Sequence, residues 1–158
     1  MQVFSGHAGP VQAGTFTPDG KRLLTASEDG SLILWDPRSA APIWKLSAED
    51  ARFGTVNGIT ALAVNTAGTV AVVGGANGEV RVVNISKGEV LGTLEGHSEG
   101  ESIEAIEFLE LGGGSTNAGV VVTGGTDGRV CIWDLTTMRL RISVAHSVSR
   151  ENHSPFLL

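Results

Sequence analysis

The sequence predicts an all-β protein made of three repeated four-stranded units, and three observations support this prediction. Valine-rich runs such as 70–73 and 120–122 lie beside glycine clusters, and the chain holds 22 glycines in 158 residues. This pattern is typical of many short strands joined by tight turns. Three segments of the chain also repeat one another. No segment has the length and the 3.6-residue periodicity of a convincing helix.

The repeat is defined by three anchors in a fixed register. The segments "SEDGSLILWD" (27–36), "ANGEVRVVN" (76–84) and "GTDGRVCIWD" (125–134) each place a turn residue six positions before a closing residue. Upstream lies an apolar-x-Ala-x-x-apolar pattern, and an apolar residue follows each closing residue by eleven positions. The turn and closing residues are Asp29 and Trp35, Asn77 and Val83, and Asp127 and Trp133.

The first unit, 7–46, shows the expected elements in order. Strands are predicted at 11–16, 22–27, 32–36 and 42–46, joined by turns at 18–20, 29–30 and 37–41 whose Pro, Asp and Gly residues suit hairpins. The same register places the second unit at about 55–94 and the third at 97–144. Extra residues fall in the links 47–55 and 111–119, where insertions cost little.

Composition narrows the classes of partner. Seventeen acidic and eleven basic residues give a net charge of −6, which argues against direct nucleic-acid binding and suits a basic protein partner. The alternative is that the net negative charge serves only to keep the protein soluble. Cys131 is the single cysteine, so an internal disulfide is excluded and a reducing compartment is expected. With no apolar run of about 20 residues to span a membrane, we predict a cytoplasmic or cytoplasmic and nuclear protein.

The motifs of these units resemble those of the WD40 repeat family of β-propellers. The residues that carry the resemblance are "GH" at 6–7 and 96–97, "SEDG" and "TDG" at the turns, and "LWD" and "IWD" at the strand ends, and it extends over residues 3 to 146. It implies four-stranded blades arranged around a channel. It further implies two hydrogen-bonded structural tetrads, made of His7, Thr25, Asp29 and Trp35, and of His97, Thr123, Asp127 and Trp133.

The second unit departs from this pattern. Thr55, Val73, Asn77 and Val83 stand where the tetrad residues would fall, so we expect this blade to be the least stable of the three. A catalytic Ser/Thr–His–Asp set is an alternative meaning of the tetrads, but a set that repeats in each blade is unlike a hydrolase site. We therefore expect no enzyme activity, cofactor, metal site or small-molecule substrate.

A closer resemblance is to the angio-associated migratory cell protein family, carried by "VFSGH", "GPVQAGTFTPDGKR" and "EDGSLILWD" followed by a blade without the WD signature. That family includes a fungal WD-repeat chaperone whose acidic face holds the basic N-terminal segment of a large-subunit ribosomal protein. The resemblance implies escort of a basic ribosomal protein during ribosome assembly. A generic adaptor in a ubiquitin-ligase or signalling complex is the alternative.

Four glutamates are the candidate partner-binding residues, because they are expected on the propeller face formed by the GH loops and the Asp-Gly turns. They could equally be part of a solvated surface. These residues are Glu28, Glu79, Glu99 and Glu101.

Three blades are fewer than the four to eight that close a propeller. Residues 1–6 align with the stretch before the third unit, which predicts the last strand of a preceding blade. Residues 147–158 lack the repeat pattern. We therefore expect the chain to be a fragment of a larger ring.

Overall fold

The computed structural model describes residues 1–54, 57–109 and 119–145, which form twelve strands and no helix. The all-β prediction is confirmed. The strands make three antiparallel four-stranded sheets, hereafter blades 1, 2 and 3. Blade 1 holds β1 (Val11–Phe16), β2 (Leu23–Ser27), β3 (Leu32–Asp36) and β4 (Ala41–Leu46). Blade 2 holds β5 (Ile59–Val64), β6 (Val70–Gly75), β7 (Val80–Asn84) and β8 (Glu89–Leu94), and blade 3 holds β9 (Ile103–Leu109), β10 (Val120–Gly125), β11 (Arg129–Asp134) and β12 (Arg139–Ala145).

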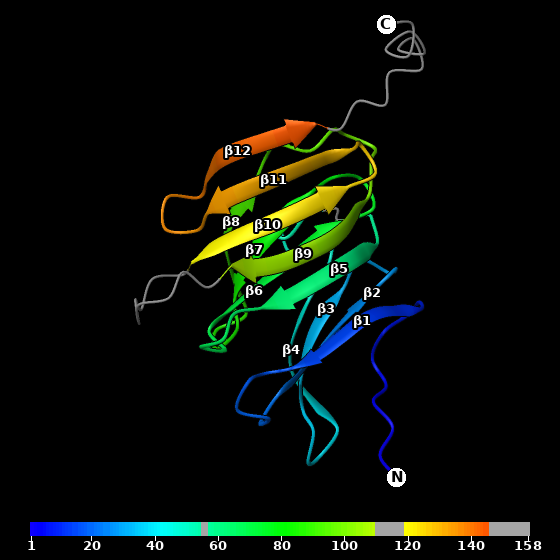
Figure 1. Ribbon diagram of the computed structural model, residues 1–158. Coiled ribbons are helices and arrows are strands. Elements are labelled where there is room, and N and C mark those ends of the chain that lie inside the picture. Colours follow the sequence, from blue (N-terminus) through cyan, green and yellow to red (C-terminus); the bar gives the residue numbers. More distant parts are fainter. Residues whose placement is uncertain (55–56, 110–118, 146–158) are drawn as a thin grey trace, which may run out of the picture.

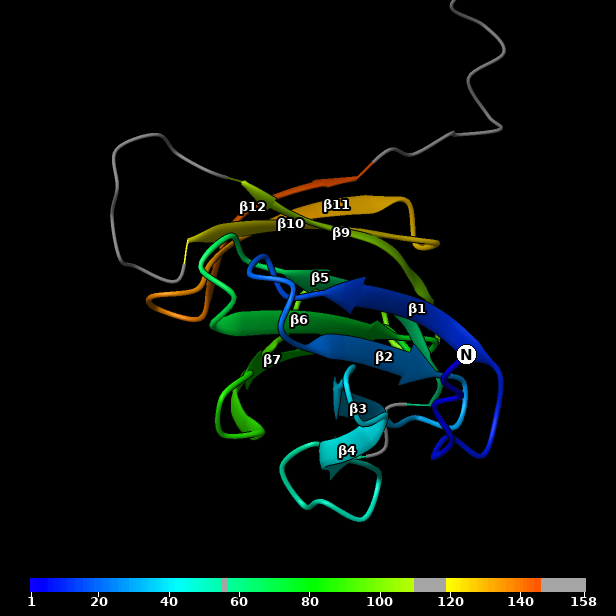
Figure 2. The same cartoon turned by 90° about the horizontal axis from the view of Figure 1, so that it is seen from below.

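The blades follow one another in chain order, each packed against the next (Figure 1). Within a blade the strands pair in sequence order, so β1, β5 and β9 lie at one edge of their sheets and β4, β8 and β12 at the other. The first strands contact one another, β1 against β5 and β5 against β9, as the view from below also shows (Figure 2). This is the radial arrangement of propeller blades.

Apolar side chains fill the two joints between blades. At the first joint Leu24 and Leu32 pack with Val73 and Val83 of blade 2 in one buried cluster. At the second joint the opposite face of blade 2 packs on the face of blade 3 that carries Trp133. Burial of this kind contributes about 25 cal/mol per Å² of apolar surface, so the joints are the main source of stability.

The outer face of blade 3 is exposed at positions that are buried in the other two blades. Val130 is 46% exposed, whereas the equivalent Leu32 and Val80 are fully buried. Val144 is 59% exposed, against 1% for the equivalent Leu94. Among the described residues no further blade covers this face. The residues compared are all aliphatic, so their different exposure comes from the packing around them.

The hairpins that lead into the fourth strands share one backbone conformation. Each has a register shift beside its closing residue, and the fifth residue after the closing residue has a positive φ. Glycine occupies this position in blade 2 at Gly88, but Ala40 (φ 56°) and Met138 (φ 54°) occupy it in blades 1 and 3. L-residues adopt this conformation at a cost, so the turn geometry is imposed by the repeat.

The strand bounds of blade 1 match the expected ones to within one residue at each end. No strand is assigned within 1–10, so the last strand of a preceding blade, expected at 1–6, stays a prediction. This segment nevertheless runs over blade 1, where the Phe4 ring meets the Trp35 ring edge-on at a centroid distance of 5.5 Å. The unit boundaries stay predictions, and the tail 147–158 lies outside the described residues. Within the described ranges, no helix is long and apolar enough to cross a membrane.

Candidate protein-interaction face

The candidate glutamates and the His and Asp residues of the tetrads all lie at one end of the blades. The Thr and Trp residues of the tetrads lie on the strands behind them. We call this end of the blades the GH face, and it consists of the loops 5–10 and 95–102 and the turns 28–30, 77–79 and 126–128. The turns join the second strand of each blade to its third. The tetrad side chains connect this face to the interior of the blades.

In blade 3 the four residues of the expected tetrad form one hydrogen-bonded chain. The Trp133 indole N–H donates to Thr123 Oγ1 at 2.9 Å, and Thr123 Oγ1 lies 2.7 Å from His97 Nε2. The other ring nitrogen, His97 Nδ1, lies 3.1 Å from Asp127 Oδ2. The two ring nitrogens of His97 thus join the Thr123 hydroxyl to the Asp127 carboxylate, so that each polar group in the chain has a partner. The Asp127 carboxylate also accepts the backbone N–H of Ser98, which ties the GH loop to the turn.

Blade 1 contains the same chain with one extra residue in it. Trp35 donates to Thr25 at 2.7 Å, and Thr25 contacts His7 Nε2 at 2.6 Å. His7 Nδ1, however, contacts the Ser31 hydroxyl at 2.7 Å, and Ser31 in turn donates to Asp29 at 2.6 Å. The nearest His7–Asp29 approach is 3.7 Å, so the direct hydrogen bond expected from the resemblance is replaced by a bridge through Ser31. The equivalent residue in blade 3 is Arg129, whose longer side chain points elsewhere and donates to the Gly96 carbonyl.

These networks shift the pKa of their acids and of His7. Burial of the Asp29 carboxylate raises its pKa, but hydrogen bonds from Ser31 and Ala8 outweigh burial and hold the pKa well below its ordinary value. The pKa of Asp127 is also lowered, since its hydrogen bonds outweigh the effect of burial. Burial lowers the pKa of His7 below 6.5, although the Asp29 carboxylate opposes this shift. The blade 1 network therefore contains a neutral imidazole and a charged carboxylate at neutral pH.

We expect the His7 network to make stability depend on pH below the ordinary histidine pKa of 6.5. Because the folded pKa of His7 is depressed, the unfolded chain binds more protons, and the free energy of unfolding falls as the pH drops below 6.5. Urea denaturation at several pH values, compared with the variant His7→Gln, measures this. The variant should be less stable at pH 7 and should have a shallower slope. Equal slopes in the two proteins would contradict a neutral His7.

Blade 2 lacks the tetrad and buries an arginine that sequence reasoning did not single out. Arg81 is 9% exposed, donates from Nε to the Phe53 carbonyl at 3.2 Å, and pairs through Nη2 with Glu79 at 2.9 Å. Its Nη1 has no hydrogen-bond partner among the described residues. Phe53 is fully buried and packs in the cluster that contains Val73 and Val83. Thr55 lies outside the described residues, and the lower stability of this blade stays a prediction.

Three of the four candidate glutamates gather at the joint between blades 2 and 3. Gly100 donates its N–H to the Asn77 carbonyl at 3.1 Å, so the turn 77–79 touches the loop 98–101. Glu99 and Glu101 are exposed there, and Glu101 accepts the Thr126 hydroxyl at 2.7 Å. The Glu79 carboxylate is about one third exposed and is already paired with Arg81.

Glu28 lies at the neighbouring joint. It is exposed, its carboxylate accepts a hydrogen bond from the Gln12 amide, and its backbone lies against Gly58 of blade 2. The four glutamates therefore lie on one face but at two separate joints. Of the four candidates, only Glu99 and Glu101 are both exposed and carried by the same loop.

The remaining reactive side chains form no cluster. Cys131 is fully buried, and burial raises the pKa of its thiol. In the part of the chain that the structure describes, no three His, Cys, Asp or Glu side chains are placed to hold a metal ion.

The family model described as "WD domain, G-beta repeat" matches residues 1–36 and 88–134, which include both tetrads. The chain belongs to the WD40 repeat family. The stretch between the two matches contains most of blade 2, where the tetrad is lost.

Related proteins extend over almost all of this WD40 chain. It is 37% identical to an uncharacterized WD repeat-containing protein of Schizosaccharomyces pombe, over 92% of this chain and 36% of the relative. It is 29% identical to the human angio-associated migratory cell protein, over 92% of this chain and 34% of that protein. The chain thus spans about a third of the length of these curated relatives.

A solved structure resembles the chain in both sequence and fold. The crystal structure of Chaetomium thermophilum Sqt1 bound to the N-terminus of the ribosomal protein L10 is 29% identical, with a TM-score of 0.74, over 91% of this chain and 39% of that one. The resemblance to the angio-associated migratory cell protein family is confirmed by these comparisons.

Proposed function

We propose that this WD40 chain is part of a non-catalytic protein-binding propeller that holds a basic segment of a ribosomal protein on its GH face. The observation that carries the proposal is the pair Glu99 and Glu101, exposed side by side on a loop held by backbone hydrogen bonds. A related WD40 protein, Sqt1, has been solved with the N-terminus of ribosomal protein L10.

Hydrogen bonds hold the loop that carries Glu99 and Glu101 in a fixed position. The Ser98 N–H is held by Asp127, and the Ser102 N–H donates to Thr126 at 2.9 Å. The loop that carries the two glutamates is thus fixed at both ends to the Asp-Gly turn of blade 3. A loop held in place loses little conformational freedom when lysine or arginine side chains bind the carboxylates that it carries. The tetrads act in this proposal as supports and do not touch the partner.

The test is binding of a fluorescein-labelled peptide with the sequence of the L10 N-terminus, followed by fluorescence anisotropy. We expect Glu99→Lys and Glu101→Lys each to weaken binding about two- to fivefold, and the double variant to weaken it further. We also expect binding to weaken as salt is raised, because the charges are exposed to solvent.

Glu89→Lys is the matched control. Glu89 is exposed and the substitution changes the net charge equally, but the residue begins β8 at the opposite end of blade 2. Binding should be unchanged in this variant. If all three single variants lose the same affinity for the peptide, the effect comes from net charge alone, and Glu99 and Glu101 are not part of the site. Recovery of a ubiquitin-ligase or signalling complex from cell extract, without binding of the peptide, would favour the adaptor function instead.

A further inference from the structure

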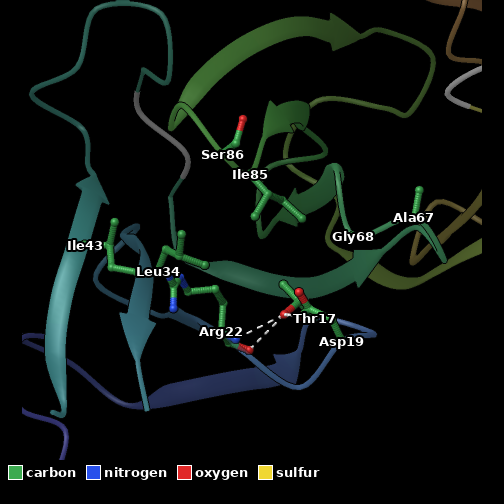
Figure 3. Close-up of a pocket in the computed structure, with 9 residues that line it drawn as sticks. All are labelled: Thr17, Asp19, Arg22, Leu34, Ile43, Ala67, Gly68, Ile85 and Ser86. Carbon is green, nitrogen blue, oxygen red and sulfur yellow. Dashed lines mark hydrogen bonds between the residues drawn. The ribbon is translucent and has the colours of Figure 1, made fainter. Parts of the chain in front are cut away.

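A pocket of about 300 Å³ lies between blades 1 and 2, at the end opposite the GH face (Figure 3). Two contacts between the blades lie next to residues of its lining. On one side Gly68 of blade 2 lies against Pro18 of blade 1, and on the other side Gly88 lies against the Trp44 ring. The Trp44 indole N–H also donates to the Ile85 carbonyl at 2.9 Å. The two blades are therefore in direct contact beside the pocket, whose volume lies within the size range of small binding sites.

The lining of the pocket combines an apolar floor with polar walls. Leu34 and Ile85 are each 3% exposed and form the floor, and Ile43 is 46% exposed at the mouth. Arg22 from blade 1 and Ser86 from blade 2 lie on opposite sides, as Figure 3 shows. A ligand that suits this lining has an aliphatic side chain and an anionic group close to it.

The charges around the pocket are unequal, although both signs are present. The Asp19 carboxylate is used by its own turn, where it accepts the Thr17 hydroxyl at 2.6 Å and the Lys21 N–H at 3.0 Å. Asp36 likewise accepts the Arg38 N–H at 2.9 Å. Glu89, at the start of β8, is a third acidic residue at this end and is exposed.

Basic side chains also surround the pocket, and within the described ranges their charges are not paired. Four basic side chains are exposed on the turns that surround the pocket, and among the described residues none of them makes an ion pair. These residues are Lys21, Arg22, Arg38 and Lys87. Arg22 donates from Nη1 to the neighbouring Lys21 carbonyl at 3.0 Å, which leaves its other N–H groups directed to solvent or ligand.

We propose that this pocket binds an acidic peptide segment that inserts one aliphatic side chain. The aliphatic group packs on Leu34 and Ile85, and a flanking carboxylate is paired by Arg22. The proposal does not depend on the proposed function of the GH face, because it concerns the opposite end of the blades and a partner of opposite charge. The two ends together would hold a basic and an acidic partner at once.

The experiment measures the anisotropy of a fluorescein-labelled peptide, Glu-Glu-Leu-Glu-Glu, on titration with the full 158-residue chain. We expect saturable binding that falls at least about fivefold in Arg22→Gln, since one charge-assisted hydrogen bond is lost. Ile43→Ser should weaken binding as well. Both side chains are exposed, so neither change should impair folding.

Two controls separate the pocket from general attraction between charges. Arg139→Gln removes an exposed positive charge at the same end, on blade 3, and should leave binding unchanged. A peptide with serine in place of leucine should bind at least about fivefold more weakly, because the apolar contact is lost. The proposal is overturned if the first peptide does not bind, if Arg22→Gln and Arg139→Gln weaken it equally, or if the serine peptide binds as well.

Discussion

Replacing Trp133 by alanine is expected to lower the free energy of unfolding by about 3–5 kcal/mol. The indole is 1% exposed and packs among buried residues from both blades 2 and 3. Its N–H is donated to Thr123, so truncation leaves a cavity and also removes one donor from the His97 network. Both losses act on the folded state, and the cavity is the larger because the neighbouring strands cannot collapse into it.

Urea denaturation followed by circular dichroism measures this change, since tryptophan fluorescence would itself be altered. Ile142→Ala is the control, because Ile142 lies on β12 and is 52% exposed. It should change the free energy of unfolding by no more than about 0.5 kcal/mol. A loss below about 1 kcal/mol in Trp133→Ala would show that this part of the joint between blades 2 and 3 contributes little.

Replacing Gly74 by valine is expected to destabilise the protein by about 1–3 kcal/mol through overpacking of the same joint. A Cβ atom at Gly74 would lie 2.4 Å from Ile103 Cγ2 and 2.6 Å from Ile103 Cβ, closer than any real contact. Ile103 is fully buried and stiff at its branched Cβ, so it cannot move aside without shifting β9. The first strand of blade 3 thus rests directly on the backbone of blade 2.

The equivalent substitution in the next blade is a matched control. Gly124 occupies the same repeat position, but a Cβ there meets only the Ala105 Cβ at 4.0 Å. Gly124→Val should be neutral or slightly stabilising, because valine favours strands and restricts the unfolded chain. In the double variant, the loss should be less than the sum of the losses from Gly74→Val and Ile103→Ala, since the two side chains compete for one space. Thermal or urea unfolding of the unchanged protein, the three single variants and the double variant tests the prediction, and equal effects at Gly74 and Gly124 would contradict it.

Several features of the site depended on contacts that the repeat pattern does not encode. Ser31 is an unremarkable residue in the sequence, yet it bridges His7 and Asp29. Arg81 appears only as a charge within a strand, yet it is buried and pairs with Glu79, which changes the character of one candidate partner residue. The sequence did hold a sign that Arg81 is buried, because the equivalent positions in the other units are the apolar residues Ile33 and Cys131. At Ser31 no such signal existed.

Alternating apolar residues and turn residues at fixed spacing were enough to predict the strands, the turns and the grouping of the strands into three four-stranded units. Such signals are local, and three copies of one pattern reinforce one another. The packing of the sheets was needed to show which glutamates lie together, that His7 Nδ1 contacts the Ser31 hydroxyl, and that a pocket lies between Leu34 and Ile85. These contacts join segments far apart in the chain, and their geometry depends on how two sheets pack, which no local pattern of residues specifies.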